Sequence, residues 1–423
     1  MMRVIYIFLC IMFMAGLNAC GEEQRFEISA DDNEAPGAPE YLSYKPLIGG
    51  ARIFYNPPKD KDVLSVNAEY INNSGRKSIF SASYFTDSLD VMGIADTLEH
   101  VVQLYAVDRA GNRSVSVPVT VRASESALLN VAKSIEVLAG FNSFIVQWDN
   151  ILEQTVNIYV DMSFSKPGQT RDLTWVLTSN KAVNREIIDD VVLSDGETLH
   201  VKVRIGDTYG NRSQSIEMGQ IKVMSDEVLS KEFWRIPNTN DSIAGIPMCF
   251  GNGYECRSLN VIDGILSRGE IFNIMHTAGR GRTGKAEDGN APWNFLIDLG
   301  DYYELSRIVT NQRHDLNAVA FKPHERGNYY LEDNVNQYNM YYLNEETNEW
   351  EFISQHTIEV PTGLSELEIA RLGYAGDMAL MYPEVPAFTK PTRWFRYEAL
   401  TGFSYSPLVL SEITLYGKKA NVH

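Results

Sequence analysis

Acidic side chains are the first candidates for chemistry, because a glycosidase acts through two carboxylates held a short distance apart. Adjacent pairs occur at Asp189-Asp190 and Glu345-Glu346. Neighbouring residues on a strand point to opposite faces, so neither pair can act together across one bond. The sequence also lacks a Gly-x-Ser-x-Gly elbow, a His-Glu-x-x-His motif and a phosphate-binding loop. The residues therefore favour a protein that is not an enzyme, and a hydrolase would need a carboxylate pair assembled by the fold.

Four cysteines offer a second kind of chemistry. Cys10 lies in the apolar start of the chain, and Cys20 follows that start directly. Six residues, two of them glycines, separate Cys249 from Cys256, so a short disulfide-closed loop is feasible in an oxidising compartment. A zinc pair is the weaker alternative, since no second Cys/His pair stands at ligand spacing.

The first 19 residues are apolar and contain one basic residue, Arg3, which is the pattern of a secretory signal. The sequence Leu17-Asn18-Ala19-Cys20 resembles the lipobox of bacterial lipoproteins, whose cysteine is lipidated and becomes the N-terminus. Gly21-Glu22-Glu23 resembles the surface-export signal of Bacteroidota lipoproteins. These resemblances imply lipidation at Cys20 and a position on the outer-membrane surface. The alternative is a transmembrane anchor, although the run is shorter than the roughly 20 residues that a span needs.

The chain has 423 residues and a formal charge of −18, and this length suggests about three domains. Removal of residues 1–19 takes away one arginine and no acid, so the charge becomes −19. Such acidity disfavours nucleic acid and anionic membrane surfaces as partners. Contact with the membrane is therefore expected through the N-terminal lipid only. Residues 20–37 are polar and acidic and are predicted to form a flexible tether.

An internal repeat organises the next part of the chain. The sequence Gly-Asn-Arg-Ser occurs at residues 111–114 and again at 210–213, which is a spacing of 99 residues. An alternating apolar strand precedes each copy, at 101–107 and at 201–205. Earlier strands also match, and each carries a large aromatic residue, Tyr55 in one and Trp148 in the other. The spacing is the length of one β-sandwich domain.

This repeat resembles a tandem pair of fibronectin type III domains, which would occupy residues 38–124 and 125–225. The Gly-Asn-Arg-Ser segments are interpreted as turns between strands, because glycine and asparagine tolerate positive φ. A ligand-binding loop is the alternative. Tyr55 and Trp148 are predicted to be core residues.

Segments after residue 225 follow the order of a discoidin-like domain, the fold of the coagulation-factor C domains. The matching segments are Val261–Gly264, Trp293–Gly300, Leu305–Val309, Val335–Tyr342 with Asn348–Trp350, Trp394–Tyr397 and Leu410–Gly417. The predicted fold class is therefore all-β, with two immunoglobulin- or fibronectin III-like sandwiches followed by a discoidin-like jelly-roll sandwich over residues 226–423. Insertions are expected near 279–291 and 360–390.

Carbohydrate-binding members of that family hold sugar hydroxyls with a His, an Arg and an Asn on loops at one end, and an aromatic ring stacks on the sugar. The resemblance assigns these roles to His276, Arg313 and Asn317, with Phe403 or Tyr405 as the ring. Imidazole, amide and guanidinium groups suit hydroxyls, and a ring suits the apolar face of a sugar. The alternative is structural: His276 caps a loop, Arg313 pairs with Asp315, and Phe403 belongs to the core.

Asp263 and Glu412 match positions that bind a structural calcium in many family members. Calcium prefers several hard oxygen ligands, and one carboxylate from each end of the domain would clamp the termini together. The alternative is that Asp263 forms an Asx-turn and that Glu412 pairs with a nearby arginine.

The whole arrangement resembles Bacteroidota lipoproteins encoded beside outer-membrane glycan importers. It implies a surface lipoprotein that binds glycan in support of polysaccharide capture and uptake, with importer proteins as neighbours. One alternative is an adhesion or assembly protein that binds a protein partner through a flat apolar patch. Another is an accessory subunit of a glycoside hydrolase.

Overall fold

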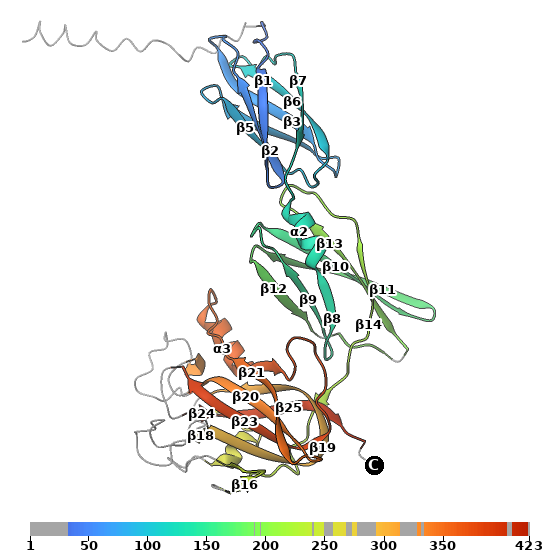
Figure 1. Ribbon diagram of the computed structural model, residues 1–423, viewed down its shortest axis with the longest axis vertical. Helices are drawn as coiled ribbons and strands as arrows, with labels where there is room; N and C mark the ends of the chain where they lie inside the picture. The colour runs from blue at the N-terminus through green and yellow to red at the C-terminus, as the bar shows by residue number, and fades with distance from the viewer. Residues whose placement is uncertain are drawn as a thin grey trace, which may run out of the picture.

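Three β-domains follow one another in a row, from the first at the top of Figure 1 to the third at the bottom. The computed structural model describes residues 33–189, 191–194, 196–238, 241–248, 257–267, 273–276, 293–313, 328–330, 334–403 and 408–421. Among the described residues, each domain has a large hydrophobic core, within residues 51–123, 127–221 and 229–415, and Ile274 with Val409 forms a small separate cluster. The predicted all-β class, with tandem β-sandwiches, is confirmed.

The first domain packs a three-stranded sheet, β1-β2-β5, against a four-stranded sheet, β4-β3-β6-β7, with antiparallel pairing throughout. Tyr55 is fully buried between them, as predicted from the sequence. The strands are β1 (Glu40–Leu47), β2 (Gly50–Asn56), β3 (Val63–Ile71), β4 (Lys77–Ser83), β5 (Ser88–Met92), β6 (Glu99–Asp108) and β7 (Val117–Arg122).

The second domain repeats this plan with the sheets β12-β9-β8 and β11-β10-β13-β14. Trp148 occupies its core and is 2% exposed. A short helix caps the sandwich, and the hydroxyl of Ser126 accepts a hydrogen bond from Leu129 N at its N-terminus. The elements are α2 (Ala127–Ser134), β8 (Glu136–Ala139), β9 (Phe144–Asp149), β10 (Val156–Lys166), β11 (Gln169–Ser179), β12 (Val183–Ile188), β13 (Thr198–Gly206) and β14 (Ile216–Ile221).

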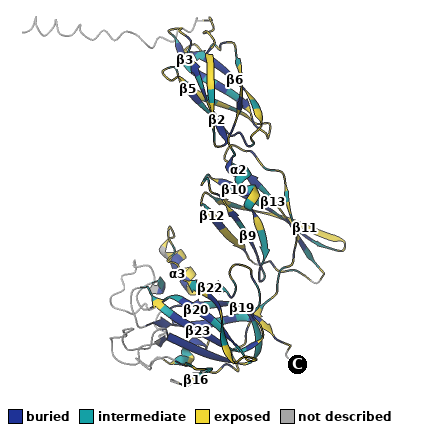
Figure 2. Ribbon diagram, viewed as in Figure 1, coloured by how far each residue is buried: buried dark blue, intermediate teal, exposed yellow. Residues whose placement is uncertain are grey.

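The alternation of side chains along the strands explains why these segments form sandwiches. In β10 the buried positions are Val156, Ile158, Val160, Met162 and Phe164, and half-buried residues stand between them. This period of two puts every apolar side chain on the face that meets the other sheet. Figure 2 shows buried residues along the strands of all three domains.

The third domain is built around a sheet in the order β15-β25-β19-β23-β20-β21, with β22 paired to β19. β19 bends near Gly300, whose φ is +77°, so that its first half pairs with β23 and its second half pairs with β25. Its strands are β15 (Glu227–Val228), β16 (Ser242–Ile243), β17 (Ile246–Pro247), β18 (Met275–His276), β19 (Trp293–Asn311), β20 (Val335–Asn344), β21 (Glu349–Thr357), β22 (Asp377–Leu380), β23 (Thr392–Gly402), β24 (Val409–Leu410) and β25 (Glu412–Lys419). Its helices are η2 (Ser258–Val261), η5 (Asn328–Tyr330) and α3 (Glu366–Ala375).

One expected insertion, 360–390, contains α3 and β22, and a capping box between Ser365 and Glu368 starts the helix. The other, 279–291, lies outside the described residues. No helix in the described part of the chain is long and apolar enough to cross a membrane.

The Gly-Asn-Arg-Ser segments form turns, which confirms their interpretation, with φ of +92° at Gly111 and +86° at Gly210. The second copy also joins two domains. The Asn211 amide is fully buried and donates to Gly93 O of the first domain at 2.8 Å and to Asp207 Oδ2 at 2.7 Å. The first copy makes an equivalent contact with the segment that precedes the first domain: Asn112 Nδ2 donates to Glu34 O at 3.2 Å.

The junction of the second and third domains depends on the buried carboxylate of Asp226. Its oxygens accept hydrogen bonds from Arg307 Nε at 2.8 Å and Nη2 at 2.9 Å, from Ser306 Oγ at 2.6 Å and from Asn142 Nδ2 at 2.9 Å. The Phe141 and Phe388 rings meet edge to face beside it, with centroids 4.8 Å apart. Asn142 and Phe141 belong to the second domain, so polar and apolar contacts together fix the third domain on the second.

Candidate ligand-binding site

Several segments that carry predicted site residues converge at one end of the third domain. Strand β18 holds His276, whose backbone pairs with Val409 of β24. Val409 is fully buried and forms a second, parallel bridge with Asn334, at the start of β20. His276 and Asn334 therefore both pair with Val409, which links the strand of His276 to the start of β20.

Asn334 organises this end of the domain. Its side chain is fully buried, accepts a hydrogen bond from Arg313 N at 3.0 Å and donates to Arg313 O at 3.0 Å. Its own carbonyl accepts a hydrogen bond from Phe403 N at 3.2 Å. The structure therefore brings the backbones of Arg313 and Phe403 to one asparagine, and both residues are half-buried.

Gln312 supports the same arrangement one residue earlier. Its buried amide donates to Val335 O at 3.0 Å and accepts from Val335 N at 3.1 Å. Two amide side chains thus replace the backbone pairing that a β-ladder would provide between these segments. These side-chain hydrogen bonds hold Gln312 and Arg313 against the start of β20.

Aromatic side chains border this point. The Phe403 ring lies edge to face with Tyr330, with centroids 6.0 Å apart and an interplanar angle of 82°. Burial raises the pKa of the Tyr330 hydroxyl, with a smaller contribution from the negative charge of Asp377. The hydroxyl therefore stays neutral at physiological pH and keeps its capacity to donate a hydrogen bond.

Other predicted residues fall outside the described part of the chain. These are Asn317, Tyr405, Cys20, Cys249 and Cys256, together with the side chain of His276. Their roles stay predictions.

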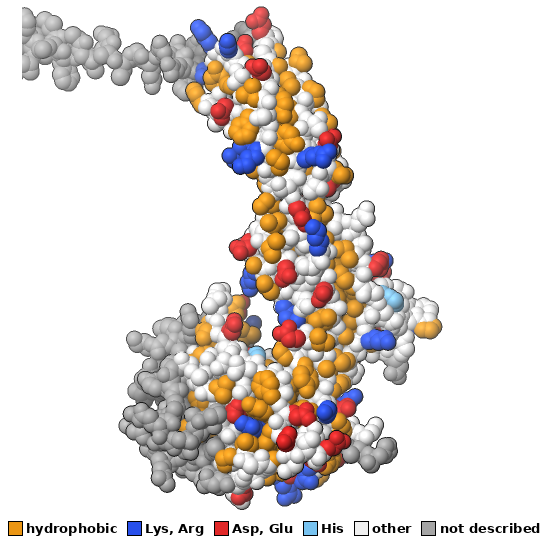
Figure 3. Space-filling view, viewed as in Figure 1, with side chains coloured by type: hydrophobic (Ala, Val, Ile, Leu, Met, Phe, Trp, Pro, Cys, Tyr) orange, Lys and Arg blue, Asp and Glu red, His pale blue; other side chains and the backbone are white. Residues whose placement is uncertain are grey.

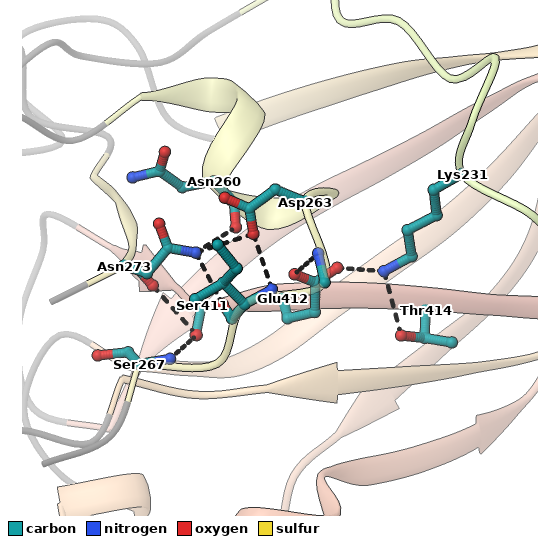
Figure 4. A network of polar contacts seen from close by, with 10 residues as sticks. Lys231, Asn260, Asp263, Ser267, Asn273, Ser411, Glu412 and Thr414 are labelled. Carbon is teal, nitrogen blue, oxygen red and sulfur yellow. Dashed lines mark hydrogen bonds and ion pairs between the residues drawn. The ribbon is translucent and has the colours of Figure 1, made fainter. Parts of the chain in front are cut away.

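Asp263 and Glu412, the predicted calcium ligands, meet in a polar network (Figure 4). Glu412 is 2% exposed, and its carboxylate pairs with the Lys231 ammonium and accepts a hydrogen bond from Gly264 N at 3.0 Å. Asp263 Oδ1 accepts from Ile265 N at 2.8 Å, which is an Asx-turn, and from Asn273 Nδ2 at 3.0 Å. Burial raises the pKa of Glu412, and the nearby Lys231 charge opposes that rise.

These residues do not fit a calcium ion as they lie. Calcium takes six to eight oxygen ligands, whereas both oxygens of Glu412 and Oδ1 of Asp263 face N–H donors. No group of three acidic, histidine or cysteine side chains suited to a metal occurs among the described residues. The network instead ties the loop before β18 to β25.

Asn273 completes the link to the candidate site. Its side-chain amide donates to Ile265 O at 2.7 Å, and its backbone carbonyl accepts a hydrogen bond from Ser411 Oγ at 3.1 Å. Asn273 lies three residues before His276, so the network fixes the direction in which β18 leaves the loop. Sequence reasoning missed Asn334, Gln312 and Asn273, because each contacts residues remote in the chain.

A cavity of about 550 Å³ opens at the other end of β20. Tyr302, Asn344 and Lys390 line it, together with Glu345. None of the predicted ligand-binding residues lines this cavity. On the face shown in Figure 3, acidic and basic side chains are interspersed over all three domains.

Comparison with known proteins found one family match and several solved structures that are similar to this chain. The family described as "Domain of unknown function (DUF4959)" matches residues 36–123, within the first domain. A SusE-like protein of solved structure is similar over 70% of this chain and 100% of its own, at 18% identity and a TM-score of 0.36. The C-terminal domain of a chitobiase from Bacteroides fragilis covers 46% of this chain and 100% of its own, at 13% identity and a TM-score of 0.29.

A two-domain fibronectin type III segment of chicken tenascin is similar over 44% of this chain and 99% of its own, at 18% identity and a TM-score of 0.20. No curated protein matches the chain. The family match ends at residue 123, before the third domain that contains the candidate site.

Proposed function

We propose that this chain is a non-catalytic surface lipoprotein of the outer membrane that binds glycan through a discoidin-like third domain. The observation that carries the proposal is the convergence on Asn334, which places Arg313 and Phe403 together beside the strand of His276. The contacts at Asn334 are made by the backbones of both residues, and the Phe403 ring also packs against the core of the domain. A guanidinium and a partly buried ring carried by neighbouring segments suit the hydroxyls and the apolar face of a sugar. Bound glycan would then pass to importer proteins in the same membrane.

The charged pairs in the described part of the third domain support a binding role over catalysis. Glu398 is 6% exposed and pairs with Arg396, and Asp298 accepts two hydrogen bonds from Arg393. Both carboxylates already accept hydrogen bonds from a guanidinium, so their oxygens are engaged in structural contacts and not presented to a ligand.

A second candidate function is adhesion to a protein partner. Apolar side chains on α3 are open to solvent, with Leu367 62% exposed and Leu372 and Tyr374 each 44% exposed. A contiguous exposed apolar patch is typical of a protein-binding surface, and this helix is where such a patch would be sought. A glycan array separates the two functions, because only the first predicts a hit.

Arg313→Ala should weaken the affinity for the oligosaccharide that binds best on the array. Loss of a charged donor to a sugar hydroxyl costs about 1.5–3 kcal/mol, which is roughly a ten- to hundredfold loss of affinity. The measurement is calorimetric titration of a variant whose melting temperature is unchanged. Lys390→Ala, in the cavity at the other end of β20, is the matched control. Loss of affinity in the control alone would move the site to that cavity.

Cys20→Ala should release the protein from the membrane fraction, because Cys20 is the predicted point of lipid attachment. Fractionation of cells followed by immunoblotting measures the effect. Cys10→Ala is the control, since Cys10 lies within the same apolar run and should leave the protein in the membrane. A Cys20→Ala variant that stays in the membrane would show that the apolar run itself is the anchor.

A further inference from the structure

Lys231 lies in the segment that enters the third domain from the second, three residues after the end of β15. Its ammonium pairs with Glu412 and donates to Thr414 Oγ1 at 3.3 Å, both on β25. The ammonium also lies 5.6 Å from the centroid of the Trp234 ring. The Lys231 side chain is 17% exposed and that of Glu412 is 2% exposed, so the pair is largely shielded from water.

A buried carboxylate needs a compensating positive charge, because an isolated ion in a protein interior is very costly. Two kinds of cation could serve at Glu412: a bound metal ion or an ammonium from the chain itself. The ammonium already occupies one carboxylate oxygen, and Gly264 N donates to the other at 3.0 Å. A second cation at the same carboxylate would be repelled by the first.

The consequences reach beyond the ion pair. Gly264 has φ of +78°, so it turns the chain sharply enough to direct its N–H at Glu412. The same loop is held by Asn273, which leads into β18 (Figure 4). A line of contacts therefore runs from Lys231 through Glu412 and Gly264 to the strand of His276.

We infer that the Lys231 ammonium is the resident cation at Glu412, so that a lysine at the start of the third domain stands in the place that a calcium ion would take. Calcium is then unnecessary for the third domain to fold. Lys231 is a positioning residue for the loop before β18. The inference rests on the proposed function only because β18 borders the candidate site, and its test measures stability and needs no glycan.

The test compares melting temperatures of the full-length protein by calorimetry, in EDTA and in millimolar calcium chloride. The wild type is expected to melt at the same temperature in EDTA and in calcium chloride. Lys231→Met keeps the length of the side chain but leaves Glu412 buried and unpaired. The expected result is a melting temperature of the third domain lower by roughly 6–20 °C. The double variant Lys231→Met/Glu412→Gln should regain most of that loss, because neither charge remains.

Lys419→Met is the matched control, since Lys419 makes an exposed ion pair with Asp301 at the end of the same strand. It should melt as the wild type does. A wild-type melting temperature that rises with calcium would overturn the inference, and this measurement needs no variant. The inference would also be overturned if Lys231→Met melted at the same temperature as the control Lys419→Met. If the wild type binds no glycan on the array but neither of these melting results is found, the proposed function is contradicted and the Lys231 inference stands.

Discussion

Asp226→Ala is expected to destabilise the third domain by about 3 kcal/mol and to free it from the second. Asp226 accepts four hydrogen bonds at the junction, two of them from Arg307. Removal of one partner from a buried ion pair costs about 3–5 kcal/mol. The lower end applies because Arg307 is 21% exposed and water can reach it in the variant. Urea unfolding measures the stability, and small-angle X-ray scattering measures the attachment.

The control for Asp226 is Asp90→Ala. Asp90 accepts the same two-pronged contact from Arg52, at 2.6 and 2.7 Å, but this pair lies on the surface of the first domain. Water and salt screen such pairs, so the control should show little change in stability. Equal effects in the two variants would mean that the junction does not depend on the Asp226 carboxylate.

Asn334→Ala is expected to disorganise the candidate site and to abolish measurable glycan binding. The variant removes both side-chain contacts to the Arg313 backbone, one N–H and one carbonyl. Each buried polar group left without a partner costs about 1–3 kcal/mol. Because Arg313 is half-buried, water can replace part of the loss, and we expect about 2–3 kcal/mol in total. Urea unfolding and calorimetric titration with the array ligand measure the two effects.

Asn336→Ala is the control for Asn334. Asn336 lies two residues later, donates a hydrogen bond to Ile358 O at 3.0 Å and accepts a long, exposed one from Thr401 Oγ1 at 3.4 Å. Its loss should cost about 1 kcal/mol and leave glycan affinity unchanged. If Asn334→Ala binds glycan as tightly as Asn336→Ala does, the ligand does not contact the Arg313 segment.

Strand periodicity made the fold predictable from the sequence. The alternation at 101–107 and 201–205 became β6 and β13, and glycine at 111 and 210 took the positive φ expected of a turn. Such patterns are local, because burial of one strand face shows in every second residue. The aromatic residues of the matched strands, Tyr55 and Trp148, are buried for the same reason.

The joints and the organising contacts of the site depend on residues far apart in the chain. Arg307 reaches Asp226 across 81 positions, and Lys231 reaches Glu412 across 181. From the sequence alone, the carboxylate of Glu412 suits a metal ligand and an ion-pair partner equally well. The contact between Lys231 and Glu412 depends on the fold, and no local pattern in the sequence records it.

The two Gly-Asn turns have a consequence for how such chains are assembled. In each copy the asparagine amide binds a backbone carbonyl of the preceding segment, Glu34 O in one and Gly93 O in the other. The two acceptors differ in what they require of their own residue. Gly93 has φ of +83°, and a Cβ there would lie 2.8 Å from the Tyr209 side chain, so the first domain must present a glycine at this point. Asn72 of the first domain also donates to Tyr209 O at 3.2 Å. Recombination would therefore have to move the first two domains as a pair, whereas the bond to Glu34 O makes no comparable demand on the segment before the first domain.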